Sequence, residues 1–169
     1  MYWLDPKTAI KDPELARKAL SNALHVGKIN VLVSQDAADD VEYVRLVERL
    51  MPELRFFDHM DGYPFINPRY PHLRFPIHTG WTRMTKEGFL MIRDFHVPAE
   101  GLLETLTFHH TINADTPLMG RFVLGKDGVP IGLEKPLTNK EVLENNEWPI
   151  YASILRREYI NVEGKGVVF

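Results

Sequence analysis

The chain has 169 residues, of which 44% are hydrophobic and 25% are charged, and its formal net charge is −3. This composition is typical of one soluble globular domain, residues 1–169, and the negative charge argues against binding nucleic acid by neutralising phosphates. Cysteine is absent, which excludes disulfides, thiolate metal sites and cysteine nucleophiles. No apolar run reaches the roughly 18 residues of a membrane helix, no polybasic patch suits a membrane surface, and the first residues lack a signal-peptide core. We therefore expect a cytoplasmic protein.

The segment from residue 12 to residue 58 has the pattern of a helix followed by a β-α-β unit. Asp12 and Pro13 form a helix start, and apolar residues at helical spacing predict a helix over 13–25, ended by Gly27. Residues 28–34 are apolar on both faces, which predicts a central strand. A second helix is expected over 37–51 and a second strand over 54–58. The turn SQDAADD after the first strand has no glycine, so phosphate binding is not expected there.

Residues 58–76 contain a proline every few positions and cannot form long regular elements. Long loops in small domains are usually functional, and aromatic side chains are common anchors of protein interfaces. We therefore interpret this segment as an arm that contacts another protein. The candidate interface residues are Tyr63, Phe65, Tyr70 and Phe75, together with Trp81 and, at the apolar C-terminus, Phe169.

The second half of the chain has the pattern of strands and turns. Residues 73–84 and 89–95 predict a hairpin with its turn at 85–88, and residues 105–112 alternate as a strand. A further hairpin is expected from 118–124 and 129–133, across the turn GKDG.

The last part of the chain begins with a capping box. Thr138 and Glu141 have the spacing of this motif and predict a short helix to about Asn145. Residues 150–159 fit a helix or a strand, with the helix preferred, and the glycines at 164 and 166 free an apolar tail. The predicted fold class is α+β: an N-terminal helix-strand-helix-strand, then a mostly antiparallel sheet of about five strands with a short C-terminal helix.

Six of the seven histidines lie between residues 56 and 116. His59 and Asp61, two positions apart, form a metal site with open positions if His110, or His109 in its place, joins them. Arg121 is then a candidate for pairing with the carboxylate of a co-substrate. This spacing resembles that of the iron(II)/2-oxoglutarate dioxygenases, and the resemblance implies a divalent transition metal as cofactor.

Histidines also serve as acids and bases without a metal. The candidates for such catalysis are His78, His96 and His109, with Asp58, Asp94 or Asp115 as partners. The alternative for each is an ordinary histidine that is hydrogen-bonded to the backbone.

Two functions therefore remain open. The first is a non-catalytic subunit or protein-binding module of a larger assembly, with a protein partner or a homo-oligomer. The second is a small enzyme with a histidine–aspartate site, which would be an oxygenase or a hydrolase if it binds a metal.

Overall fold

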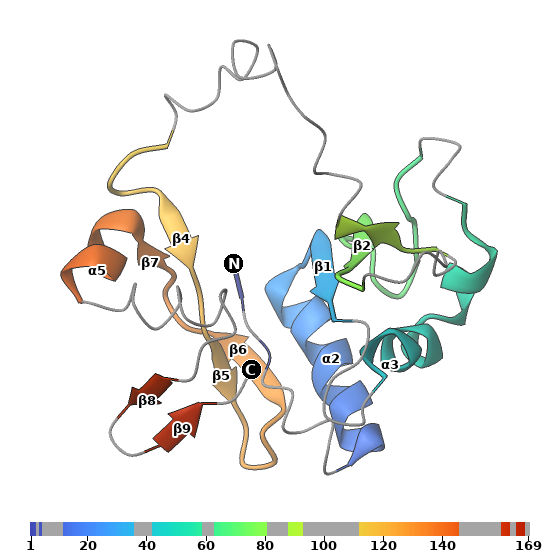
Figure 1. Ribbon diagram of the computed structural model, residues 1–169, viewed down its shortest axis with the longest axis horizontal. Coiled ribbons are helices and arrows are strands. Elements are labelled where there is room, and N and C mark those ends of the chain that lie inside the picture. The colour runs from blue at the N-terminus through green and yellow to red at the C-terminus, as the bar shows by residue number, and fades with distance from the viewer. Residues whose placement is uncertain are drawn as a thin grey trace.

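The structure is a computed structural model that describes residues 1–2, 4, 12–35, 42–58, 63–80, 88–92 and 112–145, and the backbone of 160–162 and 165–167. Its elements form two parts (Figure 1). The N-terminal part, residues 12–92, holds α2 (Pro13–Gly27), β1 (Val31–Ser34), α3 (Tyr43–Leu50), the 3-10 helix η1 (Pro52–Phe56), β2 (Phe75–His78) and β3 (Leu90–Met91). The C-terminal part, residues 112–145, holds β4 (Pro117–Met119), β5 (Phe122–Leu124), β6 (Pro130–Leu133), β7 (Leu137–Thr138) and α5 (Asn139–Glu144).

Helix α2 begins and ends close to where the sequence predicts. The Asp12 side chain accepts hydrogen bonds from the backbone amides of Glu14 and Leu15, at 2.9 and 3.2 Å, and so caps the helix. At the other end the chain leaves the helix through Lys28, which has a left-handed φ of 47°. The predicted end at residue 25 is two residues short, because the helix continues to Gly27.

Strands β1, β2 and β3 form a parallel sheet in that order. Val31 pairs with Phe75 and Ser34 with His78, so β2 is the central strand and β1 is an edge strand. The prediction that 28–34 is a central strand is therefore wrong for the described sheet. The predicted hairpin of 73–84 with 89–95 is also wrong, because β3 runs parallel to β2. Gly88, at φ 74°, passes directly against the Leu54 backbone before the chain enters β3.

The predicted strand at 54–58 is a 3-10 helix instead. Pro52 occupies the first turn of η1, and the amide of Leu54 donates to the carbonyl of Met51 at 3.1 Å. Leu54 is fully buried, so the apolar run that suggested a strand belongs to a helical turn with one inward side chain. The second predicted helix is confirmed over Tyr43–Leu50, and its predicted start lies outside the described residues.

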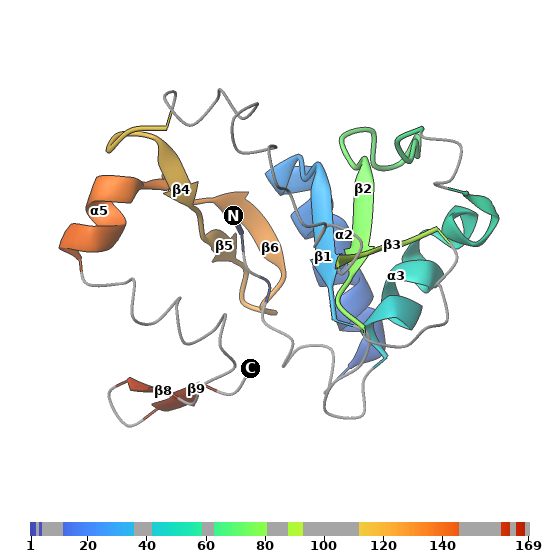
Figure 2. The same ribbon diagram turned by 45° about the horizontal axis from the view of Figure 1, so that its top comes forward.

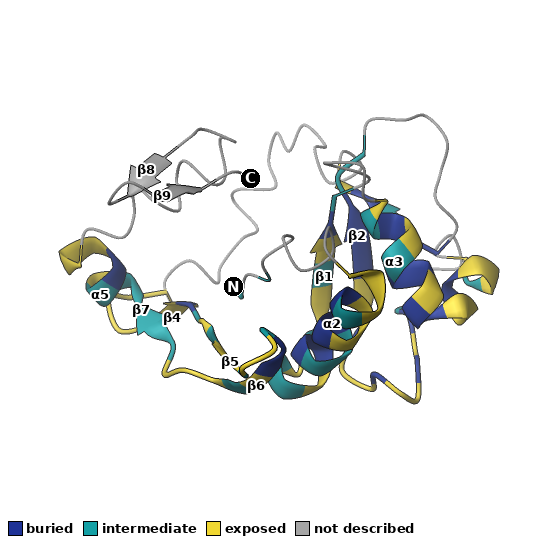
Figure 3. Ribbon diagram, turned by 90° about the horizontal axis from the view of Figure 1, so that it is seen from below, coloured by how far each residue is buried: buried dark blue, intermediate teal, exposed yellow. Residues whose placement is uncertain are grey.

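The core lies between α2, α3, η1 and one face of the sheet. Figure 3 shows α2 with its buried residues on one side of the sheet, whereas β1 is in part coloured as exposed, at Val31 and Val33. The buried cluster takes residues from the helices, from the loop before β2 and from the segment before β3: Leu20, Leu24, Val44, Val47, Leu50, Met51, Leu54, Phe65, Tyr70, Leu73 and Phe89. Because this core closes around the loop at 63–73, that loop is part of the folded body of the protein.

The C-terminal part consists of two short antiparallel ladders and one helix. β5 and β6 form the predicted hairpin, with Gly128 at φ 78° in its turn. The predicted strand 118–124 divides at Gly120, and its first half, β4, pairs with β7. The predicted capping box is confirmed, since Thr138 and Glu141 cap each other's backbone amides at 3.2 and 2.8 Å.

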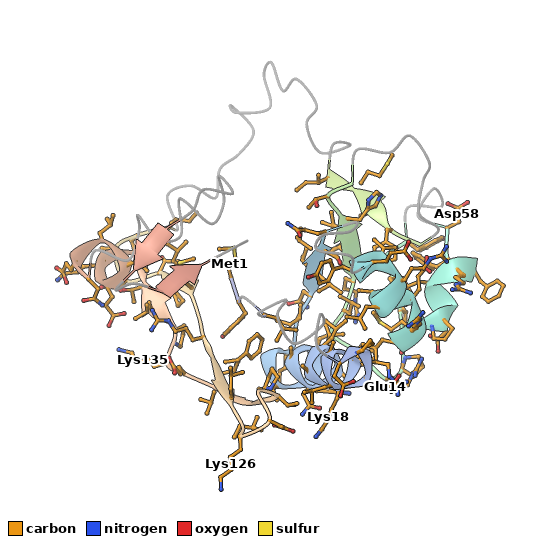
Figure 4. All side chains as sticks on the ribbon, turned by 60° about the horizontal axis from the view of Figure 1, so that its bottom comes forward. Met1, Glu14, Lys18, Asp58, Lys126 and Lys135 are labelled. Carbon is orange, nitrogen blue, oxygen red and sulfur yellow. The ribbon has the colours of Figure 1, made fainter. Side chains whose placement is uncertain are left out.

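Helix α2 joins the two parts, because β6 packs against it (Figure 2). Asn22 on α2 donates to the Pro130 carbonyl at 3.2 Å, and Lys18 forms an ion pair with Asp127 at 3.0 Å. Figure 4 shows Lys18 close to the hairpin tip that carries Lys126. The N-terminal amine of the chain also donates to the Leu118 carbonyl at 2.8 Å.

The α+β class is confirmed. The described strands do not form one antiparallel sheet of five, because they divide between the parallel sheet, two antiparallel pairs and the pair β8 (Ile160–Val162) with β9 (Lys165–Val167). The strand β9 includes Val167, the first residue of the apolar tail that we expected to be freed by the glycines at 164 and 166. Among the described residues, no helix is long and apolar enough to cross a membrane.

Candidate interaction surface

Two of the predicted interface residues are buried within the chain itself. Phe65 and Tyr70 both belong to the core cluster. Phe65 lies edge-on to Phe57 with ring centroids 5.3 Å apart, and the Tyr70 hydroxyl is hydrogen-bonded to the Ser21 hydroxyl at 2.9 Å. Neither residue is available to a partner, because the loop uses both to attach itself to α2 and η1.

A polar network also holds this loop to η1. Arg69 binds both carboxylate oxygens of Glu53, at 2.8 and 3.0 Å, and Asn67 donates to the same carboxylate at 3.3 Å. The Asn67 side chain accepts from the Arg69 amide at 2.9 Å, which fixes the turn between them. A hydrogen bond from the residue's own backbone amide, followed by the contacts with Arg69 and Asn67, holds the pKa of Glu53 below its usual value.

A second carboxylate connects η1 to α3. Glu48 on α3 is buried, and its Oε2 accepts from Arg45 at 3.2 Å and from Arg55 at 3.3 Å. A buried carboxylate requires such partners, because burial without them is costly. Arg55 lies in η1, so the 3-10 helix is tied to α3 on one side and to the loop on the other.

On this fixed base three large apolar side chains face the solvent. Phe56 is 90% exposed, and Tyr63 and Ile66 are each 71% exposed. We call Phe56, Tyr63 and Ile66 the arm surface. Figure 4 labels Asp58, which lies just after η1 and marks this end of the molecule. Of the predicted interface residues, Tyr63 belongs to the arm surface, and Phe75 is exposed on the sheet.

Sequence reasoning missed Phe56 and Ile66, although a signal for the first exists. Phe56 is the last residue of η1 and Phe57 follows it in an extended conformation, so the two adjacent side chains point in different directions. Once Phe57 packs on Phe65, its neighbour Phe56 is directed outward.

The catalytic candidate His78 lies at the end of the central strand β2, and its side chain has no exposed surface. Its Nδ1 accepts a hydrogen bond from the Gly80 amide at 3.2 Å, and its ring meets the edge of Phe89 with centroids 6.3 Å apart. A side chain in this position supports the strand end, and a substrate would reach it only after the chain moved.

Other candidate residues, for a metal, for catalysis and for an interface, fall on parts of the chain that the structure does not describe. His59, Asp61, Trp81, Asp94, His96, His109, His110 and Phe169 lie outside the described residues. Arg121 is exposed between β4 and β5, and its carbonyl accepts from the Glu134 amide at 3.0 Å. Within the described ranges, no group of three or more histidine, aspartate or glutamate side chains is placed to hold a metal ion.

Comparison with protein-family models, with curated proteins and with solved structures gives no match for this chain.

Proposed function

We propose that this chain is a non-catalytic, protein-binding module of a larger assembly, and that the arm surface is its main contact with the partner. The observation that carries the proposal is the exposure of Phe56, Tyr63 and Ile66, which lie on η1 and on the loop that is attached to it. Full burial of one such side chain contributes about 1.5–3 kcal/mol, so their exposure in the chain alone leaves a large gain for binding.

The surroundings of the arm surface support the same function. Protein interfaces combine an apolar, aromatic centre with a polar rim. Here the rim includes the exposed ion pair of Glu53 with Arg69. Because Glu48 and Glu53 already fix η1, a partner pays little conformational entropy to order the surface, which favours binding.

The test is retention of a partner by the full-length chain, purified from cells of its source organism and measured by native mass spectrometry. The wild type is compared with a triple variant of the arm surface, Phe56→Ser with Tyr63→Ser and Ile66→Ser. The matched control replaces three exposed apolar residues of the C-terminal part, Leu124→Ser with Ile131→Ser and Leu143→Ser.

We expect the wild type and the control to carry a stoichiometric protein partner, and the arm variant to be a monomer with an unchanged circular dichroism spectrum. A wild type that is a clean monomer would contradict the proposal. So would an arm variant that keeps its partner.

The alternative, a histidine–aspartate enzyme, depends on His59, Asp61 and His110 or His109. Elemental analysis of the purified protein is its test, because a stoichiometric transition metal would favour the enzyme over the binding module.

A further inference from the structure

Among the described strands, β1 has no neighbour on the side away from β2, and we call this side its open edge. The carbonyls of Asn30 and Ser34 accept hydrogen bonds from the amides of Phe75 and Thr79, at 3.1 and 2.9 Å. Successive residues of a strand alternate in the direction of their backbone groups. The even-numbered residues of β1 therefore face β2, and the amides and carbonyls of Val31 and Val33 face outward, where no described strand pairs with them.

The side chains at this edge are apolar and exposed. Val31 is 47% exposed and Val33 is 53% exposed, and Phe75, the register partner of Val31, is 42% exposed. Register partners in a sheet lie on the same face, so these three side chains form one apolar strip. Helices α2 and α3 pack on the opposite face, through Leu32 and the core cluster.

This edge, although short, carries none of the side chains or bulges that protect many edge strands. Natural edge strands carry lysine, proline or a bulge that prevents another strand from adding. β1 reads VLVS, which contains no charge and no proline, and its register with β2 is regular. Parallel sheets are normally covered on both faces. On the face away from the core cluster, Ile77, the register partner of Val33, is buried, whereas Val31, Val33 and Phe75 stay exposed.

We propose that the open edge of β1 binds an extended peptide segment of a partner protein, which adds to the sheet as a further strand. The alternating outward amides and carbonyls of Val31 and Val33 require an extended backbone, because a helix has no free amides and carbonyls in such a row. The strip of Val31, Val33 and Phe75 selects aliphatic or aromatic side chains at alternate positions of the peptide. This site is separate from the arm surface and does not depend on it.

The edge is tested first in the free full-length chain by amide hydrogen exchange. We expect the amides of Val31 and Val33 to exchange at least about tenfold faster than those of Leu32 and Ser34, which bond to β2. Equal protection of all four amides would mean that the edge is already paired within the chain, and it would overturn the proposal.

Binding is tested with a phage-displayed library of random twelve-residue peptides, and with the enriched peptides by fluorescence anisotropy. The central variant is Val33→Pro, which removes one outward donor and is tolerated at a strand edge. Val33→Thr keeps the donor but weakens the apolar strip, and Leu143→Thr is the control on a distant exposed residue.

We expect enriched peptides to slow exchange at Val31 and Val33, and to bind Val33→Pro at least about tenfold more weakly than wild type. The loss for Val33→Thr should be smaller, and Leu143→Thr should bind as the wild type does.

Unfolding of Val33→Pro would overturn the assigned direction of this amide. Absence of enrichment, or peptides that bind all variants equally, would overturn the site. A dimer that forms with rising concentration and is lost in Val33→Pro would assign the edge to a second copy instead.

Discussion

The N-terminal and C-terminal parts of this chain are both built from short strands and short helices, but they are stabilised differently. The N-terminal part closes a core of helices, loop and sheet around Met51 and Leu54, which are completely buried. The buried hydrophobic residues of 112–145 are Met119, Val129 and Val142. The C-terminal part therefore depends on its turns and caps, and on its contact with α2.

This difference in the size of the buried core matters for the two proposed binding sites. The arm surface and the β1 edge both lie on the N-terminal part, where a core behind them holds the backbone in one arrangement. A rigid base reduces the entropy lost on binding. On the C-terminal part, the exposed residues Leu124 and Ile131 lie on a hairpin that has less support of its own.

The strongest test of this difference is a matched pair of glycine substitutions. Gly88 and Gly128 both have φ near 75°, which strains any other residue. A Cβ at residue 88 overlaps the backbone of Leu54 in the core, whereas a Cβ at residue 128 meets nothing within 4 Å. We expect Gly88→Ala to lower the free energy of unfolding by more than about 3 kcal/mol, and Gly128→Ala by about 1–2 kcal/mol.

Urea denaturation followed by circular dichroism measures both values. Equal losses for the two variants would mean that the close approach of Gly88 to Leu54 contributes nothing, and that the two parts are equally tolerant.

The sequence predicts the features of this fold that depend on neighbouring residues. The Asp12 cap, the box of Thr138 with Glu141 and the β5–β6 turn are all interactions within a few positions, and all three are confirmed. The features that it does not predict depend on distant partners. Nothing near residues 28–34 indicates that β1 has one neighbour among the described strands. The parallel pairing of β3 with β2 joins segments that are about a dozen residues apart, and the chain reaches β3 past the Leu54 backbone.

The same limit applies to the candidate site. Composition identifies 58–76 as rich in aromatic residues, but it does not say which of them turn inward. Phe65 packs against Phe57, and Tyr70 is hydrogen-bonded to Ser21 on α2. Both contacts join the loop to other elements of the chain, so the sequence of the loop alone does not predict them. Tyr63 has the same chemistry and remains exposed.

A smaller effect is expected from removal of the Thr138 cap. Thr138→Ala leaves the Glu141 amide at the start of α5 without its acceptor, and loss of such a cap costs about 1 kcal/mol. Because α5 has little core behind it, we expect this loss to appear as faster amide exchange in α5, with β1 and β2 unchanged. Lys140→Ala, on the exposed side of the same helix, is the control. Faster exchange in both parts would show that the C-terminal part unfolds together with the rest.

The smallest expected effect is a pH dependence of the contact between the two parts. The hydrogen bond from Lys18, followed by that from the Val129 amide, holds the pKa of Asp127 below its usual value. A lowered pKa in the folded chain means that the stabilisation is present above the unfolded pKa of about 4 and is lost as the pH falls through the folded value. We expect amides of the β5–β6 hairpin to exchange faster below about pH 4, after correction for the intrinsic rate, while β1 and β2 keep their protection.

Asp127→Asn retains an acceptor for the Val129 amide but not the charge, so it should remove this pH dependence. Glu53→Gln, which removes a carboxylate with a lowered pKa from the N-terminal part, should leave the hairpin unaffected. If Asp127→Asn retains the full pH dependence of the hairpin, the ion pair with Lys18 does not hold the two parts together, and the packing of β6 on α2 alone joins them.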